Sequence, residues 1–336
     1  MLESVSWIIT TKCNLECKHC YINSSPRADD YVKYDDAKKI IKNISELNLK
    51  WVFISGGEPL LYKDLKKLVL EIKDHGIEVW LCTNGVLLSK RDDILNIIDH
   101  VSIGLESVDP KVFRAIRGTD FNIIVDAMNI CKNYGINLSV DFTLLKQNIS
   151  EIDNVIDFLV EKDVDRIYIR RFVPLGRGKI NRELLDIDKQ QVLNVFKHVI
   201  EKYSIEGPAS NKVYSIDPMF IPLLHIYGYA DKKKEYEKYF RGCPVTVNRW
   251  TSIYLKYAYP CPLLARKFAK FDIANTTSDG IINYINNNPF LNRENYNSDC
   301  VSCHYYKTCG GCRAHAYAVS GNVFDIDPLC PLKNNV

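Results

Sequence analysis

Apolar strand-like runs alternate with amphipathic helical stretches through the N-terminal part of the chain. The strand-like runs are Val5–Thr10, Trp51–Ser55, Ile77–Cys82, His100–Leu105, Ile136–Leu144 and Arg166–Val173. The helical stretches are Tyr34–Leu47, Lys63–Asp74, Lys90–Ile97, Asn122–Tyr134, Ile152–Lys162 and Lys189–Tyr203. Because parallel strands need crossover helices, this alternation predicts an α/β fold with a parallel sheet. Six units are too few for an eight-stranded barrel. The pattern alone does not exclude a doubly wound sheet.

Two short motifs lie at the carboxyl ends of the first two strands, where ligands of both architectures gather. Cys13, Cys17 and Cys20 follow the first strand, and Tyr21 comes directly after them. A [4Fe–4S] cluster usually takes four thiolates, so three from one loop leave one iron free to hold a small molecule. The second strand is followed by Ser55-Gly56-Gly57-Glu58-Pro59. Its two glycines let the backbone approach a ligand, and Glu58 adds an acceptor.

The cysteine loop resembles the signature loop of radical S-adenosylmethionine (SAM) enzymes, and Gly56-Gly57-Glu58 resembles that family's motif for the SAM amino group. The resemblance implies a partial (β/α)6 barrel over residues 1–205. It also implies a cluster on the three cysteines whose open iron chelates SAM, with Tyr21 beside it. Reductive cleavage of SAM would then give a 5′-deoxyadenosyl radical that takes a hydrogen atom from the substrate. Taken alone, the three cysteines are also compatible with a zinc knuckle in which His19 is a further donor. The two glycines alone are also compatible with a plain turn.

Other strand ends carry polar residues that the same resemblance places near SAM. Glu106 and then Ser102, at the end of the fourth strand, are our candidates for contacts to the SAM ribose. Thr83-Asn84-Gly85 resembles a turn of the family that serves backbone geometry. At the end of the sixth strand, Arg171 has a planar fork that suits a carboxylate of SAM or substrate. Solvated carboxylates and a surface ion pair are the alternatives at these positions.

The C-terminal part of the chain is rich in cysteine. Seven lie there, at Cys243, Cys261, Cys300, Cys303, Cys309, Cys312 and Cys330. Their spacing resembles the SPASM domain, which carries up to two auxiliary iron–sulfur clusters, and we place this domain at residues 241–336 after a linker at 206–240. The resemblance assigns an outer cluster to Cys300, Cys303, Cys309 and Cys330, and an inner one to Cys243, Cys261 and Cys312.

Two departures from the SPASM pattern affect this interpretation. Asn248 stands where relatives often have a further cysteine, so the inner cluster lacks a fourth cysteine ligand. The close spacing of Cys309 and Cys312, in Cys-Gly-Gly-Cys-Arg-Ala, is similar to the branch that decarboxylates haem precursors. A pair of zinc sites is the alternative for the domain.

Composition narrows the remaining possibilities. The chain has 336 residues, of which 46% are hydrophobic, with a net charge of +3. No apolar run is long enough to span a bilayer and no charged-then-apolar leader begins the sequence, so we expect a cytoplasmic protein. The small charge gives no reason to expect a nucleic acid or membrane partner. Twelve cysteines in a chain without a secretory signal favour metal or redox chemistry. Because iron–sulfur clusters are sensitive to oxygen, we expect an anaerobic host.

The resemblance implies an oxidoreductase or maturase that receives electrons from a low-potential donor such as ferredoxin or flavodoxin. SPASM enzymes most often modify peptides or proteins, so we expect a peptide or protein side chain as the substrate. Oxidative decarboxylation or another side-chain modification of a haem-precursor tetrapyrrole is the alternative. A non-catalytic iron–sulfur electron carrier is an alternative of a different class, for which Gly56-Gly57-Glu58 would be superfluous.

Overall fold

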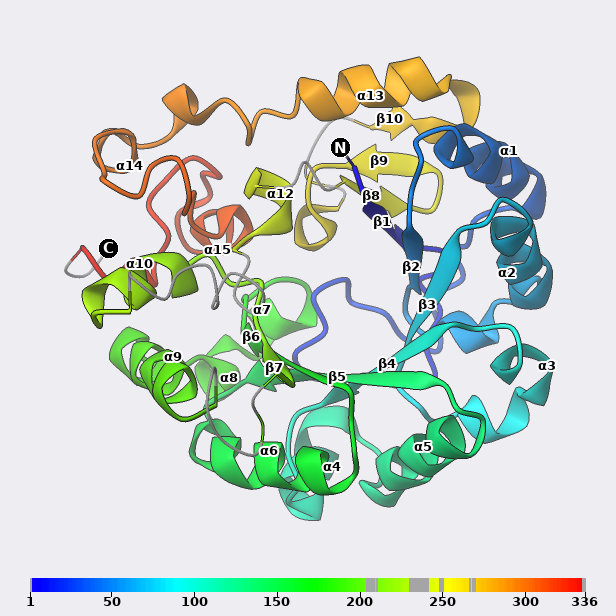
Figure 1. Cartoon of the computed structure of the whole chain (residues 1–336), viewed down its shortest axis with the longest axis horizontal. Helices are drawn as coiled ribbons and strands as arrows, with labels where there is room; N and C mark the ends of the chain where they lie inside the picture. Colours follow the sequence, from blue (N-terminus) through cyan, green and yellow to red (C-terminus); the bar gives the residue numbers. More distant parts are fainter. Residues whose placement is uncertain are drawn as a thin grey trace.

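The computed structural model describes residues 2–203, 209, 211–229, 242–247, 251–265, 267 and 270–333. Ten strands of this part form one sheet in the order β10-β9-β8-β1-β2-β3-β4-β5-β6-β7 (Figure 1). The strands are β1 Ser4–Ile8, β2 Trp51–Ser55, β3 Glu78–Thr83, β4 His100–Leu105, β5 Asn137–Leu144, β6 Arg166–Arg171, β7 Val213–Tyr214, β8 Thr251–Tyr254, β9 Tyr257–Tyr259 and β10 Phe271–Asp272.

Helices cover the outside of this curved sheet, and the C-terminal segments lie beyond its β6 side (Figure 1). The helices are α1 Tyr34–Ser45, α2 Leu65–Asp74, α3 Asp92–Leu95, α4 Pro110–Arg117, α5 Asn122–Asn133, α6 Ile152–Glu161, α7 Arg177–Ile180, α8 Arg182–Leu185, α9 Lys189–Tyr203, α10 Phe220–Ile226, α12 Pro244–Val247, α13 Ser278–Asn286, α14 Ser298–Val301 and α15 Arg313–Ser320. None of the helices described is long and apolar enough to cross a membrane.

The sheet is an open barrel. Strands β1 to β7 pair in parallel with their sequence neighbours, and β8 adds in parallel to the other side of β1. In the described part, β7 and β10 are the two ends of the sheet, so the barrel is not closed. The predicted partial barrel with a parallel sheet is therefore confirmed. All carboxyl ends of β1 to β6 lie at one rim.

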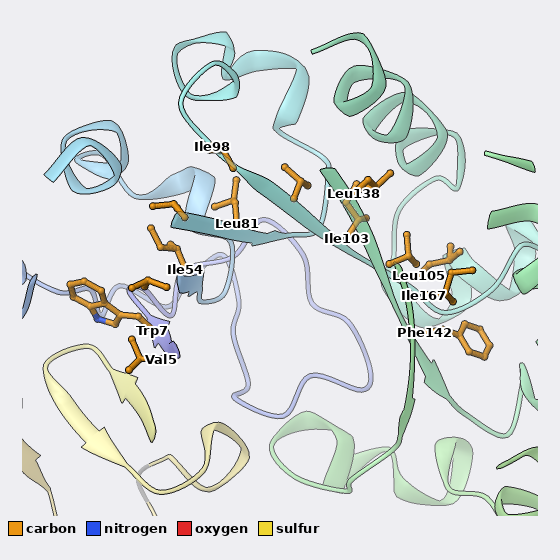
Figure 2. Close-up of a cluster of buried hydrophobic side chains, with 14 of the residues drawn as sticks. Val5, Trp7, Ile54, Leu81, Ile98, Ile103, Leu105, Leu138, Phe142 and Ile167 are labelled. Carbon is orange, nitrogen blue, oxygen red and sulfur yellow. The ribbon is translucent and has the colours of Figure 1, made fainter. Parts of the chain in front are cut away.

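Alternation along each strand separates the two faces of the sheet. Apolar residues such as Ile54, Leu81 and Ile103 pack outward against the helices in one continuous core (Figure 2). Their neighbours point to the inner face, because successive side chains of a strand alternate. The inner face is more polar, and its residues are available to a ligand.

Helices α3 and α4 differ from the sequence prediction, and α7 and α8 were not predicted either. The stretch Lys90–Ile97 was predicted as one helix, but Arg91, with a φ of −130°, limits α3 to four residues. Helix α4 was not predicted. The side chain of Asp109 caps its start by accepting from Lys111 N and Val112 N, and Gly118 ends it in the left-handed conformation. The Asp-Pro and Gly signals for this helix were present in the sequence.

The sheet also extends past the first predicted domain boundary. Strands β8 to β10 come from residues that we assigned to the C-terminal domain, yet they continue the barrel sheet beside β1. Residues 230–241 and 248–250 lie outside the described residues. They include Asn248 and most of the second half of the predicted linker at 206–240. The three-part division therefore stays a prediction.

Candidate functional site

The three motif cysteines lie in a loop that begins just after β1. Cys13 is buried, while Cys17 and Cys20 are partly exposed. Backbone N–H groups donate to two of the sulfurs. Leu15 N donates to Cys13 Sγ and Ser24 N donates to Cys20 Sγ, each at a distance of 3.4 Å. Burial raises the pKa of Cys13 to about 11. This thiol therefore becomes a thiolate when a metal displaces its proton.

Gly56 and Gly57 bring the end of β2 against the cysteine loop. A Cβ on Gly56 would lie 2.6 Å from Thr10 O, and one on Gly57 would collide with Lys12 O. Both positions therefore require glycine. Gly57 N donates to Thr10 O and Glu58 N donates to Lys12 O, each over 2.8 Å. The motif is more than a turn, because it fixes the first part of the cysteine loop.

Glu58 ties the end of β3 to the same loop. Its buried Oε1 accepts from Leu60 N (3.0 Å) and Thr83 Oγ1 (2.8 Å), and its Oε2 accepts from Asn84 N (2.8 Å). Asn84 Nδ2 then donates to Asn14 Oδ1 over 2.8 Å. Burial raises the pKa of Glu58. The Thr-Asn-Gly turn thus positions the loop through Glu58, and a contact of Glu58 with SAM stays a prediction.

Replacing Glu58 with Gln should destabilise the protein even without a cofactor. One oxygen would become an NH2 group facing a buried donor, which leaves that donor unpaired at a cost of about 1–3 kcal/mol. Chemical denaturation of the metal-free protein would measure this loss. Exposed Glu183→Gln is the matched control and should leave the free energy of unfolding unchanged. Equal stability of the two variants would contradict the positioning role.

A third strand end holds the loop, and the sequence analysis missed it. Gly176 follows β6 with a φ of +54°, and a Cβ there would lie 2.6 Å from Cys20 O. Arg177 Nε donates to Cys17 O (2.8 Å) and its Nη2 to Ser24 O (2.7 Å). Three of the loop's backbone groups are thus held from the far side of the barrel. The Gly-Arg pair in the segment that follows β6 was the signal available in the sequence.

Glu106, at the end of β4, forms a buried ion pair beside the cysteine loop. Its carboxylate accepts from Arg117 Nε and, over 2.9 Å, from Arg117 Nη2, and it lies 3.3 Å from His19 Nε2. Burial alone would raise the pKa of Glu106, but the charge of Arg117 holds it below its ordinary value. Gly104 leaves the room that the guanidinium occupies. The predicted contact of Glu106 with the SAM ribose would have to be made by a carboxylate already shared by two partners.

Arg171 donates to two buried carboxylates, and its predicted contact with SAM or substrate stays a prediction. Its Nη1 donates to both oxygens of Asp327 over 2.6 and 2.8 Å, and its Nε and Nη2 donate to Asp217. The side chain is only 5% exposed. Ser102, the other polar candidate, lies on the inner face and donates to Asp141 Oδ2 over 2.7 Å.

Tyr21 lies where the cysteine loop meets the C-terminal part. Burial raises the pKa of its phenol, and the charged groups near enough to act on it include Cys20, Cys82, Cys261 and Arg170. Tyr21 also lines a cavity of about 430 Å³ between the cysteine loop, the segment after β6 and helix α15. The cavity borders the segment that directly follows Cys20, and its lining includes none of the three motif cysteines.

The C-terminal cysteines fall into the two predicted groups. A cavity of about 260 Å³ is lined by all four outer cysteines, Cys300, Cys303, Cys309 and Cys330. The three inner cysteines, Cys243, Cys261 and Cys312, pack around one small hydrophobic cluster. Burial raises the pKa of Cys261, and the Cys243 and Cys312 thiolates would raise it further. Asn248 lies outside the described residues, so its distance from the inner group stays untested.

Arg313 lies in the outer cavity and carries donors that would suit an iron–sulfur cluster. The side chain is 2% exposed, and its Nε and Nη2 have no partner among the described residues. The anionic sulfurs of a cluster would be acceptors for them.

Comparison with known proteins agrees with this geometry. Residues 7–159 match the radical SAM superfamily, so this part of the chain is a radical SAM domain. Over 97% of its length the chain is 23% identical to the AdoMet-dependent heme synthase of Methanosarcina barkeri, of which it covers 95%. Over 67% of its length it is 29% identical to the probable GTP 3′,8-cyclase of Sulfurisphaera tokodaii, of which it covers 74%.

A solved structure extends the likeness to the fold of the whole chain. Native anSMEcpe with bound AdoMet and the Cp18Cys peptide matches with a TM-score of 0.75 and 16% identity, over 98% of this chain and 94% of that one. The likeness therefore shows a shared fold that includes the C-terminal cysteine-rich part. The chain therefore carries a radical SAM domain at residues 7–159, and these matches do not fix a substrate.

Proposed function

We propose that this enzyme cleaves SAM at Cys13, Cys17 and Cys20 and uses the resulting radical on a haem-precursor tetrapyrrole, in an oxidative decarboxylation or a related side-chain modification. The observation that carries the SAM site is the loop of three cysteines held by the ends of β2, β3 and β6. A reduced cluster bound there would supply one electron to SAM and so generate the 5′-deoxyadenosyl radical.

The residues around the loop would orient SAM and exclude water. Gly56 and Gly57 leave no side chain between the backbone of β2 and the loop. Glu58 and Arg177 hold the loop on either side. Such rigid support keeps a reactive group in one position and shields it from solvent. We assign two auxiliary clusters to the C-terminal groups, which would accept the electron left on an oxidised product, and we expect a low-potential donor in a cytoplasmic, anaerobic setting.

Two observations support a tetrapyrrole over the peptide that we first expected. The match to the heme synthase relative spans 97% of the chain, whereas the match to the cyclase relative spans 67% of it. The Cys-Gly-Gly-Cys-Arg-Ala segment at Cys309 to Ala314 is similar to the haem-precursor branch. Peptide modification is the second candidate, favoured by the fold shared with anSMEcpe in its complex with a peptide. A pure electron carrier would have no use for the glycine-fixed loop.

Anaerobically reconstituted protein with dithionite and SAM should form 5′-deoxyadenosine slowly on its own and faster with its substrate. Chromatography with mass spectrometry would measure 5′-deoxyadenosine and any change in iron–coproporphyrin III, the porphyrin probe. Loss of carbon dioxide from a propionate side chain supports the proposal. SAM binding without cleavage would refute the enzymatic activity, and cleavage that leaves the porphyrin unchanged would favour the peptide candidate.

A further inference from the structure

A polar network on the inner face of the barrel is used neither by the cysteine loops nor by the strand-end contacts. Ser102 on β4, Asp141 on β5 and Arg170 on β6 lie on adjacent strands. Residues that alternate with them, such as Ile103 and Ile169, belong to the outward core. The three polar side chains therefore point inward. Ser102 Oγ donates to Asp141 Oδ2, and Arg170 Nε donates to Asp141 Oδ1.

Arg170 keeps one edge of its guanidinium open. Its side chain is 36% exposed, although it lies on an interior strand of the sheet. Asp141 holds Nε, and the guanidinium carbon lies 5.2 Å from the centre of the Tyr168 ring. Within the part of the chain that the structure describes, Nη1 and Nη2 donate no hydrogen bond to another residue. A guanidinium fixed on one edge offers the other to a planar acceptor, and a carboxylate matches that geometry.

Arg170 is the next-to-last residue of β6, near the rim where SAM would bind. Toward the amino ends of the strands, rings fill the inner face, with Trp80 stacked on His100 at 3.8 Å and Arg166 over Trp80. Both rings are nearly buried. At the other end, Arg170 and Cys82 are near enough to act on the Tyr21 phenol, together with Cys20 of the cysteine loop and Cys261 of the inner group. Arg170 is thus among the groups near Tyr21, which directly follows Cys20 of the cysteine loop.

We propose that Arg170 binds a carboxylate of the substrate inside the barrel, with Asp141 and Ser102 holding the guanidinium in place. The proposal rests on the proposed function and deepens it, because it requires a substrate that carries carboxylates, as the propionate side chains of a haem precursor do. The carboxylate of SAM has the same chemistry, so the experiment compares the two ligands directly.

The test uses the reconstituted holoenzyme with iron–coproporphyrin III, a tetracarboxylate, as the probe. Arg170→Met should weaken porphyrin binding about tenfold to a hundredfold, the loss expected for a charge-assisted bidentate contact. The porphyrin affinity of Arg170→Lys should lie between those of the wild type and Arg170→Met, because lysine keeps the charge but lacks the planar fork of arginine. Arg166→Met is the matched control, since it removes a charge from the same face of β6 and should bind the porphyrin as the wild type does. Absorbance titration measures the porphyrin and equilibrium dialysis measures SAM.

SAM affinity and the slow formation of 5′-deoxyadenosine should stay unchanged in Arg170→Met, which also shows that the barrel is folded. A loss of SAM affinity in this variant, and in Arg170→Lys, would overturn the proposal by assigning Arg170 to SAM. If Arg166→Met weakened porphyrin binding equally, the proposal would be overturned, because the effect would then come from the loss of any positive charge on this face. If the wild type cleaves SAM but does not bind the porphyrin, the substrate class is wrong while the SAM chemistry stands.

Discussion

Replacing Cys13, Cys17 and Cys20 with Ala should abolish the formation of 5′-deoxyadenosine. These thiols are the candidate ligands of the SAM cluster, and the structure holds them in one loop between the ends of β1, β2 and β6. Without thiolates the cluster has no anchor there, and no electron reaches SAM. The expected product signal is therefore at background under dithionite, as measured by chromatography of the quenched reaction.

The iron that remains in this triple variant separates the sites. The C-terminal cysteines lie on other segments of the chain. The outer group lines its own cavity and the inner group packs around its own hydrophobic cluster, so both should keep their iron and their absorbance. Cys131→Ala is the control for losing a buried thiol outside the loop, because Cys131 packs in the core of α5 and should support normal cleavage. Loss of all iron from the triple variant would contradict separate sites, and residual cleavage would contradict the assignment of the loop.

Elements bounded by strong local signals could be predicted from the sequence. Strands β2 and β4 have the predicted ends, because each is a short apolar run followed directly by a polar motif. The three cysteines and the two glycines were found for the same reason, since their chemistry is local. Contacts between segments were harder to predict. Glu58 finds its partners at Thr83 and Asn84 only because β2 and β3 are neighbours in the sheet.

The opposite orientations of Arg170 and Arg171 show a signal that was present in the sequence but was not used. Ile167 and Ile169 are apolar and face outward, so the alternation of a strand sends Arg171 outward with them and Arg170 inward. The prediction for Arg171 used the chemistry of its guanidinium and did not use the alternation of side chains along the strand. The partners of Arg171 could not have been predicted, because Asp217 and Asp327 come from distant segments of the chain.

Asp327 connects the barrel to both C-terminal cysteine groups. It pairs with Arg171 at the end of β6, and its Oδ2 accepts from Cys312 N over 2.6 Å. Its backbone oxygen accepts from Cys330 N over 2.8 Å. Burial alone would raise the pKa of Asp327, but Arg171 and the other donors hold it below its ordinary value. The carboxylate is thus occupied as an acceptor, so it is a poor candidate for the missing ligand of the inner cluster.

Replacing Arg171 with Met should destabilise the protein by about 3–5 kcal/mol, because Asp217 and Asp327 would stay buried without their positive partner. The C-terminal iron content should fall, since Asp327 would no longer fix the Cys312 and Cys330 backbone. Denaturant unfolding and iron analysis measure the two effects. Arg182→Met is the matched control. Its pair with Asp186 is largely exposed, so the loss should be at most about 1 kcal/mol.

A second variant separates positioning from general instability. In Arg171→Met with Asp327→Asn, one of the two unpaired charges is removed, so stability should partly return. The amide would face Cys312 N or accept from it, depending on its orientation, so iron binding should recover less than stability does. Full recovery of both would contradict a positioning role for the Asp327 carboxylate. Unchanged stability and iron in Arg171→Met would show that this buried pair does not join the cysteine groups to the barrel.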